Sequence, residues 1–404
     1  MTGKTTIAVF TGNRAEYGLL SPVLRALRDH DRFHYHLIVS GAHLDPRFGN
    51  TVSEIEADGF IIGDRAVIPA AMDTSRSIAH AILAMADILD RVRPDYLMVY
   101  ADRFEGFAAV IAGSQANIPV IHLEGGDLTE GGALDDSVRH AMTKLAHLHF
   151  ATNTQAANRI LAMGEEPWRV ATVGFPAIDR IAAGDFATPA EVVSDLGLDL
   201  SAPIVLFTQH PITTDPEGVE RQITASLAAL EMLIREGVQP VLTYPNNDHG
   251  AHVIIAALQE FASRHGEAVR LRRSLGRHLY HGVMALARNP TIRIATAGNS
   301  SSGIKETPAF GCPTLDIGTR QQGRLRAANV IGADHDAAAI GAALRRCLFD
   351  DDFRSLCRDV ENPYGLGDTG ARIVRFLELL SHDRFALLRK RMLLTGETRD
   401  GWFR

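Results

Sequence analysis

Short runs of apolar and β-branched residues alternate along this chain with longer segments in which apolar residues recur at helical spacing. In the first half, continuous apolar runs predict strands at residues 7–10, 35–39, 96–100, 119–123 and 149–151. Helical spacing predicts helices at residues 77–92, 104–116 and 136–146, and another through residues 19–27 with Pro22 in its first turn. This alternation predicts a doubly wound α/β domain.

The same alternation begins again after residues 174–202, which mix Pro, Gly and charge and which we interpret as a linker with a surface helix. Strands are predicted at residues 204–208, 241–244, 269–271, 292–296 and 314–317, and helices at 219–235, 251–265, 276–287 and 337–348. We therefore expect two Rossmann-like domains that face each other across a cleft, residues 1–175 and residues 176–369.

Composition narrows the possible functions. The chain has 404 residues, 46% hydrophobic and 22% charged, and its net charge of -7 argues against nucleic acid or a membrane surface as partner. No apolar run approaches the roughly 20 residues of a membrane span, and the N-terminal apolar run is too short for a signal peptide. Cys312, Cys347 and Cys357 show no CxxC spacing. We expect a reduced, cytoplasmic protein.

Ligands of doubly wound sheets bind beyond the carboxyl ends of the strands, so residues that directly follow strands are the first candidates. The segment TGNRAEYG follows the first strand, and a glycine turn that opens a helix binds anions through free backbone N–H groups. Arg14 adds a guanidinium suited to phosphate. Alternatively, Arg14 pairs with Glu16 or another carboxylate. The dinucleotide fingerprint GxGxxG is absent, which argues against NAD.

Two carboxylates follow neighbouring predicted strands. Asp102 follows the strand at 96–100 and Glu124 the strand at 119–123. If both carboxylates face one cleft, their like charges raise each other's pKa. General acid-base catalysis requires such a shift. Asp102 could instead cap a helix, whereas Glu is a poor cap and the glycines after Glu124 suggest close ligand approach. Of Asp135 and Asp136, which begin the helix that carries Arg139, we expect one to cap it and the other to reach the cleft.

In the second half, His210 lies just beyond a predicted strand, in FTQHP. The segment GNSSSGIKE follows another strand, and its small residues can cradle a phosphate, although three serines can also form only a turn. Glu306 could accept hydrogen bonds from ribose hydroxyls. GTRQQGR adds Arg320 and Arg324 near the same edge. There is no HExxH, cysteine cluster or GxSxG motif, so we expect neither a metal site nor a serine-hydrolase triad.

Together these segments resemble the UDP-N-acetylglucosamine 2-epimerase family, especially its hydrolysing branch, which feeds sialic acid and legionaminic acid synthesis. The matching segments occur in family order over nearly the whole chain: TGNRAEYGLLSPVLRAL, ADRFE, HLEGGDLTEGGALDDSVRHAMTKLAHLHF, VGFPAID, the HP of FTQHP, YPNND, GNSSSGIKE, IGTRQQGRLRAANVI and NPYG. The resemblance implies a glycosyltransferase B-type fold. It also implies that the C-terminal helix, within residues 370–404, returns to the first domain, and that the protein is a homodimer.

The resemblance also implies roles for single residues. The catalytic residues would be Asp102, Glu124, Asp135 and His210, with Asp136 as the neighbour that could replace Asp135. The substrate-binding residues would be Arg14, Tyr17, Ser301, Ser302, Gly303, Glu306 and Arg320. No metal and no redox cofactor would be required.

The reaction implied is an elimination followed by hydration. UDP leaves C1 while a carboxylate removes the C2 proton, and a carboxylic acid then protonates C2 from the other face while water attacks C1. UDP-N-acetylglucosamine would yield free N-acetylmannosamine and UDP. A UDP-2,4-diacetamido-2,4,6-trideoxyglucose donor, a glycosyltransferase of the same fold and a non-catalytic UDP-sugar sensor are the alternatives.

Overall fold

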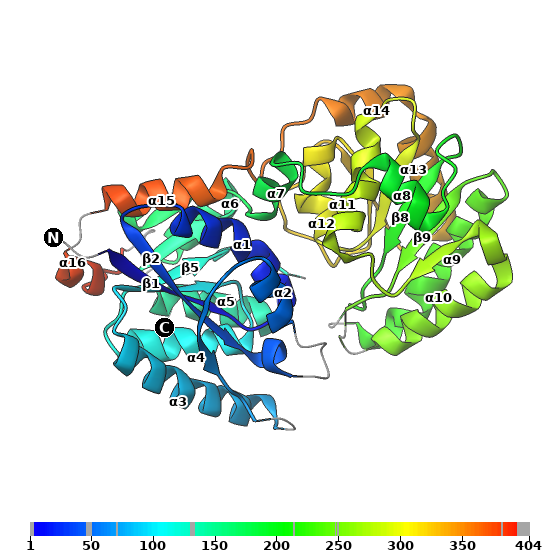
Figure 1. Ribbon diagram of the computed structural model, residues 1–404. Helices are drawn as coiled ribbons and strands as arrows, with labels where there is room; N and C mark the ends of the chain where they lie inside the picture. The colour runs from blue at the N-terminus through cyan, green and yellow to red at the C-terminus, as the bar shows by residue number, and fades with distance from the viewer. Residues whose placement is uncertain are drawn as a thin grey trace, which may run out of the picture. The chain divides into compact units, whose positions relative to one another are not determined.

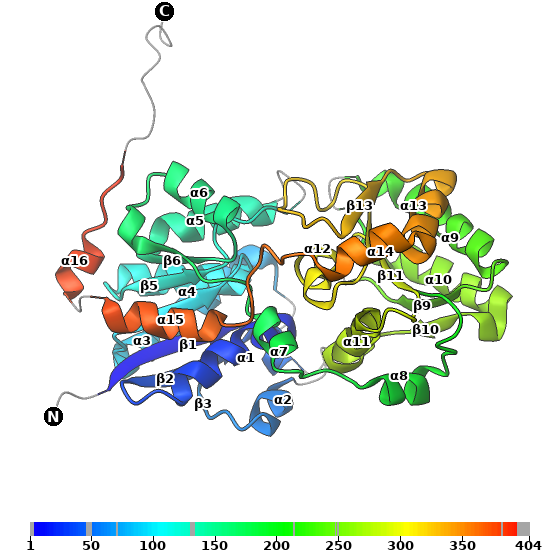
Figure 2. The same ribbon diagram turned by 90° about the horizontal axis from the view of Figure 1, so that it is seen from above.

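The computed structural model describes residues 4–45, 51–69, 72–129, 134–212, 215–246, 248, 250–380 and 383–393. The chain divides into two compact units (Figures 1 and 2). Unit 1 contains residues 1–127, 134–179 and 368–404, and unit 2 contains residues 128–133 and 180–367. Within the described residues, no helix is both long enough and apolar enough to cross a membrane.

Unit 1 is built on a seven-stranded parallel sheet in the order β3-β2-β1-β4-β5-β6-β7. Its strands are β1 Thr5–Thr11, β2 Phe33–Ser40, β3 Ile62–Ala66, β4 Tyr96–Tyr100, β5 Val120–Leu123, β6 Leu148–Ala151 and β7 Val170–Thr172. Its helices are α1 Arg14–Arg28, α2 Val52–Ala57, α3 Thr74–Val92, α4 Phe104–Gln115, α5 Leu134–Leu145, α6 Thr154–Ala162, α15 Thr369–Leu379 and α16 Arg384–Leu388.

Alternating side chains of β1 divide the core of unit 1 into two layers. Ile7 and Val9 pack with apolar residues of α1 and α15, whereas Ala8 and Phe10 pack with residues of α3, α4 and α5. Figures 1 and 2 show α1 and α15 on one side of the sheet and α3 and α4 on the other. The central strands read as continuous apolar runs because both of their faces are covered.

Unit 2 has a six-stranded parallel sheet in the order β10-β9-β8-β11-β12-β13. Its strands are β8 Ile204–Thr208, β9 Gln239–Thr243, β10 Arg270–Arg272, β11 Ile294–Gly298, β12 Thr314–Ile317 and β13 Val330–Ala333. Its helices are α8 Pro189–Leu196, α9 Val219–Ile234, α10 Ala251–His265, α11 Gly276–Ala285, α12 Ser302–Lys305, α13 Ala337–Phe349 and α14 Asp351–Arg358; α7, Ala177–Ala182, spans the boundary between the units.

The expected α/β class is confirmed, but several elements differ from their predicted positions. The helix that contains Pro22 begins at Arg14, so the expectation that Pro22 lies in the first turn is wrong. Proline has no N–H to donate to the carbonyl of Gly18, and the hydroxyl of Ser21 donates to that oxygen instead, at 3.3 Å. The strand expected at 292–296 is shifted to Ile294–Gly298. Strands β3, β7 and β13 were not predicted.

The C-terminal segment is tied to unit 1 by a buried ionic network centred on Glu165. The Glu165 carboxylate contacts Lys144 at 2.6 Å, His149 at 3.0 Å and Lys390 at 2.9 Å. Burial alone would raise the pKa of Glu165, but hydrogen bonds from these three side chains outweigh it and lower the pKa to about 2. The Lys390 ammonium also donates to carbonyls of Lys144 and Ala146, at the C-terminal end of α5.

We predict that Lys390→Met lowers the free energy of unfolding by about 2 to 3 kcal/mol. The change leaves a fully buried carboxylate with one cation fewer and frees carbonyls at the end of α5. Urea denaturation measures the effect. Arg389→Met is the matched control, because Arg389 is the exposed neighbour, and we expect it to change the free energy by less than about 0.5 kcal/mol. Equal effects of the two substitutions would contradict the prediction.

Candidate functional site

The strand order of each sheet reverses at one point, and the crevice at such a switch point is where ligands of doubly wound sheets bind. In unit 1 the switch lies between β1 and β4, and in unit 2 between β8 and β11. The loops after β1 and β4 carry Arg14 and Asp102, and those after β8 and β11 carry His210 and Ser301. The sequence candidates therefore gather at two switch points, one in each unit.

In the loop after β1, Arg14 pairs with a carboxylate, as the alternative interpretation stated, but the partner is Glu54 and not Glu16. Asn13 caps α1 by accepting from the N–H of Glu16, and Arg14 pairs with Glu54 at 2.9 Å, both side chains being largely exposed. The expected alternative partner, Glu16, is buried and accepts from the N–H of Gly12 at 2.8 Å. The Tyr17 hydroxyl donates to Asp58 at 2.7 Å.

A pair of buried acids that the sequence analysis did not single out lies beneath this loop. Burial raises the pKa of Glu16 to about 7, and the Glu105 carboxylate adds to the shift. The pKa of Glu105 is itself raised by burial. A Cβ atom on Gly12 would lie 3.2 Å from the Glu105 Cβ, and Gly41, at φ +53°, would place one 2.8 Å from the Glu105 Oε1. Both glycines make room for the buried acids.

Asp102 does not cap α4, because the N-cap residue is Arg103 and its side chain makes no capping hydrogen bond. The Asp102 carboxylate instead pairs with the guanidinium of Arg139. Ala101, which precedes it, has φ +56°, a left-handed conformation that costs about 1 to 2 kcal/mol for a residue with a Cβ. The His122 Nε2 lies 2.7 Å from the Ala101 carbonyl and holds this turn.

The hydrogen bonds of His122 define its tautomer. A carbonyl can only accept, so Nε2 carries the proton that it donates to Ala101, and Nδ1 accepts from the Thr143 hydroxyl at 3.1 Å. Burial lowers the pKa of His122 to about 4, so the ring is neutral at pH 7. His122 therefore acts as a positioning group for the turn that carries Asp102.

Arg139 joins three parts of the unit 1 site. Its guanidinium is almost fully buried, pairs with Asp102, and donates to Asp136 at 2.9 Å and to the carbonyl of Asp127 at 2.7 Å. These partners come from the loop after β4, from α5 and from the loop after β5. Of the two adjacent aspartates, the buried Asp136 is the one that joins this network, while Asp135 is exposed. A catalytic role of Asp135 remains a prediction.

Glu124 is buried at the end of β5 with φ +63°, and its N–H donates to the carbonyl of Phe150 at 2.9 Å. Its carboxylate faces the Tyr100 hydroxyl. Burial, and then the Glu124 charge, raise the pKa of Tyr100 well above 10, so Tyr100 keeps its proton. A strained non-glycine residue beside a polar partner is typical of a functional site.

The two glycines after Glu124 have a structural explanation, so they are not evidence of close ligand approach, which remains a prediction. A Cβ atom on Gly126, at φ +74°, would lie 2.2 Å from the Ala156 carbonyl oxygen. A Cβ on Gly125 would lie 2.9 Å from both the His122 Nδ1 and the Thr143 hydroxyl. These glycines are required by the packing of α6 and of His122 against the loop.

In unit 2, Asn299 fixes the backbone of His210 across the switch point. The Asn299 side chain accepts from the His210 N–H at 2.7 Å and donates to its carbonyl at 2.9 Å. The His210 Nδ1 accepts from the N–H of Asn246 at 3.0 Å, so Nε2 carries the ring proton. Burial, and then the charge of Arg320, lower the pKa of His210 to about 3. His210 is therefore a neutral N–H donor.

The serine loop begins at a position that only glycine can occupy. Gly298 has φ +126°, and a Cβ there would lie 1.9 Å from the Thr208 carbonyl oxygen of β8. The hydroxyls of Ser300 and Ser302 lie 3.0 Å apart, and Ser301, the N-cap residue of α12, makes no side-chain capping bond. Gly303 is buried against β12, where a Cβ would lie 3.2 Å from Thr314.

Two arginines predicted near this edge contact neighbouring loops. Arg320 donates to the carbonyl of Asn299 at 3.2 Å. Arg324 donates to the carbonyl of Leu128 at 2.6 Å and to the Thr129 hydroxyl at 3.1 Å. Together with the His210 N–H and the serine hydroxyls, which can also donate, they supply several donors, which suits an anion with several oxygens.

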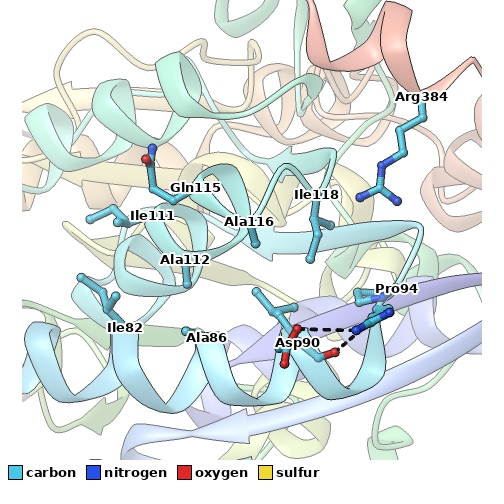
Figure 3. A pocket seen from close by; sticks show the side chains of 12 residues that line it. Ile82, Ala86, Asp90, Pro94, Ile111, Ala112, Gln115, Ala116, Ile118 and Arg384 are labelled. Atoms are coloured by element: carbon cyan, nitrogen blue, oxygen red, sulfur yellow. Dashed lines mark hydrogen bonds and ion pairs between the residues drawn. The ribbon is translucent and has the colours of Figure 1, made fainter.

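A cavity of about 570 Å³ lies elsewhere in unit 1 (Figure 3). It is lined mostly by apolar residues of α3 and α4, with Arg384 from α16 at its rim and the Asp90–Arg93 pair on one wall. Pro94 and Ile118, which also line it, precede β4 and β5, so the cavity lies at the amino ends of these strands. It contains none of the candidate catalytic residues.

The two parallel sheets define a protein with two doubly wound α/β units, of the glycosyltransferase B type. The UDP-N-acetylglucosamine 2-epimerase of Neisseria meningitidis, solved with UDP-N-acetylglucosamine, matches this fold with a TM-score of 0.79 over 93% of this chain and 99% of that one, at 19% identity. A Methanocaldococcus jannaschii UDP-N-acetylglucosamine 2-epimerase, solved with UDP-N-acetylglucosamine and UDP, gives a TM-score of 0.73 over 93% and 99% of the two chains, at 17% identity.

Sequence comparison then gives the family. Residues 25–378 match the model of the UDP-N-acetylglucosamine 2-epimerase family, and the chain belongs to this family. The hydrolysing UDP-N,N'-diacetylbacillosamine 2-epimerase of Legionella pneumophila is 32% identical over 93% of this chain and 96% of its own length. The UDP-N-acetylglucosamine 2-epimerase of Neisseria meningitidis serogroup B is 29% identical over 93% and 95%.

We predict that Glu16 makes stability depend on pH. Its folded-state pKa of about 7 exceeds the ordinary 4.5, so its contribution is full below pH 4.5 and is lost as the pH rises through 7. Glu16→Gln stays neutral and can still accept from Gly12. We expect the variant to gain about 2 to 3 kcal/mol over the unmodified protein between pH 5 and pH 8. Denaturation at both pH values measures it.

The exposed Glu56 supplies the control for this experiment. Glu56→Gln should show the same stability difference from the unmodified protein at pH 5 and pH 8. A pH-independent effect of Glu16→Gln would mean that Glu16 is ionised in the folded protein at pH 5 and would contradict the prediction.

Proposed function

We propose that this protein is a hydrolysing 2-epimerase, which converts a UDP-linked 2-acetamido sugar and water into UDP and the free 2-epimeric sugar. The observation that carries the proposal is the pair Asp102 and Glu124. They follow two paired strands by two residues and by one residue, and the last residues of these strands, Tyr100 and Leu123, are partners in the sheet. Two carboxyl groups at one sheet edge can serve two faces of a single carbon.

In the proposed first step, one carboxylate takes the proton from C2 of the sugar. The electron pair of that C–H bond forms a double bond between C1 and C2, and the C1–O bond breaks to release UDP. In the second step, water adds to C1 and the other carboxyl group returns a proton to C2 from the opposite face. The balance is one UDP-sugar and one water for one UDP and one free epimer.

In the proposed reaction, residues of unit 2 stabilise the departing diphosphate. As UDP leaves, negative charge grows on the diphosphate, and preorganised donors stabilise such charge. The neutral His210 donates through Nε2, and Arg320 and the hydroxyls of Ser301 and Ser302 lie at the same switch point. In unit 1, Arg14 sits in the first turn of α1, where the helix dipole also favours an anion.

The comparisons support the type of reaction more directly than they support the identity of the donor sugar. Sequence reasoning favours UDP-N-acetylglucosamine as the donor. The second candidate is UDP-N,N'-diacetylbacillosamine, the 2,4-diacetamido-2,4,6-trideoxy donor, because the relatives that carry its name are 32% identical, against 29% for the serogroup B relative named for UDP-N-acetylglucosamine.

We predict that the protein, incubated in heavy water with each donor alone, releases UDP and a free sugar that carries deuterium at C2. Deuterium enters because the proton removed from one face is not the one returned to the other. Mass spectrometry and proton NMR of the sugar measure this, and the faster donor is the physiological candidate. A free epimer that retains its original C2 hydrogen would exclude the elimination route, and a requirement for an acceptor sugar would indicate a transferase.

We predict that Asp102→Asn and Glu124→Gln each reduce turnover by about 10² to 10⁴, the usual size of general acid-base catalysis. UDP affinity, measured by calorimetry, should be nearly unchanged because these groups act on the sugar. Asp90→Asn, on the exposed surface of α3 beside the cavity, is the control and should retain full turnover. If both amide variants lost UDP affinity instead, Asp102 and Glu124 would be structural.

A further inference from the structure

Two adjacent residues of α11 contact the two ends of the short helix α12. The Tyr280 hydroxyl lies 2.9 Å from the Ser302 hydroxyl, and the His281 Nε2 lies 2.7 Å from the Glu306 Oε2. Ser302 and Glu306 are four residues apart, one at the first residue of α12 and the other at its C-cap. Helix α11 therefore holds the side chains of Ser302 and Glu306.

His281 is buried and its position is well determined by packing. Only 2% of the residue is exposed, and its ring centroid lies 5.6 Å from that of Phe310. The next residue, Gly282, has no room for a side chain, because a Cβ there would lie 2.6 Å from the Ala187 Cβ. A ring held in this way cannot turn its Nε2 away from Glu306 without a shift of α11.

The contact uses one oxygen of Glu306. A carboxylate accepts, so Nε2 donates, and the His281 Nδ1 is buried without a partner among the described residues. The Glu306 side chain is 15% exposed, and within the described part of the chain its Oε1 accepts no side-chain hydrogen bond. Glu306 is thus fixed through Oε2 and presents Oε1 as an acceptor.

We propose that His281 is a positioning residue for nucleotide binding, which orients Glu306 so that Oε1 accepts from a ribose hydroxyl. The inference rests on the proposed function and on the expectation from the sequence that Glu306 accepts from the ribose hydroxyls of UDP. A glutamate has three rotatable bonds, and a buried donor that fixes it before the ligand arrives removes part of the ordering cost from binding. His281 contributes to affinity in this way without touching the ligand.

The test compares three replacements that differ in where they place a donor. In His281→Gln the side-chain amide NH₂ occupies about the position of Nε2 and can still donate to Glu306. His281→Asn has its NH₂ near the position of Nδ1, and His281→Phe has no donor but can pack on Phe310. His278→Phe, on an exposed position of the same helix, is the matched control. Calorimetry measures binding of UDP and of 2′,3′-dideoxy-UDP to each.

We expect His281→Phe and His281→Asn to weaken UDP binding about tenfold and to leave binding of the dideoxy analogue within about twofold, because the analogue has no hydroxyl for Glu306. His281→Gln should restore most of the UDP affinity, and His278→Phe should change neither ligand. Equal weakening of UDP and the analogue, or no rescue by Gln, would overturn the positioning role of His281. No UDP binding by the unmodified protein would overturn the proposed function, and this inference with it.

Discussion

The buried guanidinium of Arg139 is the interaction on which the unit 1 site depends. Burying a charge away from water is costly unless the charge is paired and hydrogen-bonded. The guanidinium forms ion pairs with Asp102 and Asp136 and donates a hydrogen bond to the carbonyl of Asp127. Helix α5, which carries Arg139, is in turn held at its other end by Lys390 from the C-terminal segment. The last described residues of the chain therefore support the position of Asp102, although they are far from it in sequence.

Two of the four left-handed non-glycine residues described in unit 1 lie in the turns that carry the candidate carboxylates. Ala101 and Glu124 are both left-handed, at φ +56° and +63°, although neither is a glycine. The conformations persist because the surroundings fix them, the first through His122 and the second through the sheet hydrogen bond to Phe150. The left-handed turn at Ala101 changes the direction of the chain just before Asp102, and the turn at Glu124 changes the direction of the Glu124 side chain itself. We interpret this strain as a cost of the turns that carry Asp102 and Glu124.

Much of the fold and part of the site could be predicted from the sequence. Strands such as β4 and β8 are apolar on both faces, so their runs are unambiguous, and the residues that follow them are at a sheet edge by topology alone. The edge strands β3, β7 and β13 were missed, whereas the edge strand β10 was predicted; in β3 the exposed side admits polar residues, as in IGDRA. Side-chain partners such as His281 could not be predicted, since they join segments distant in sequence. The i,i+3 spacing of Asp136 and Arg139 was the one available signal for that pair.

The two switch points share one backbone geometry and differ in their electrostatics. In unit 1 the loops present carboxyl groups, and the carboxylate of Asp102 pairs with the guanidinium of Arg139. In unit 2 the loops present the donors His210 and Arg320 beside the acceptor Glu306, within a protein whose net charge is -7. Burial and Arg320 keep His210 neutral, with its proton on Nε2. A neutral donor can hold an anion and then release it as a product, because it does not bind the anion through a full opposite charge.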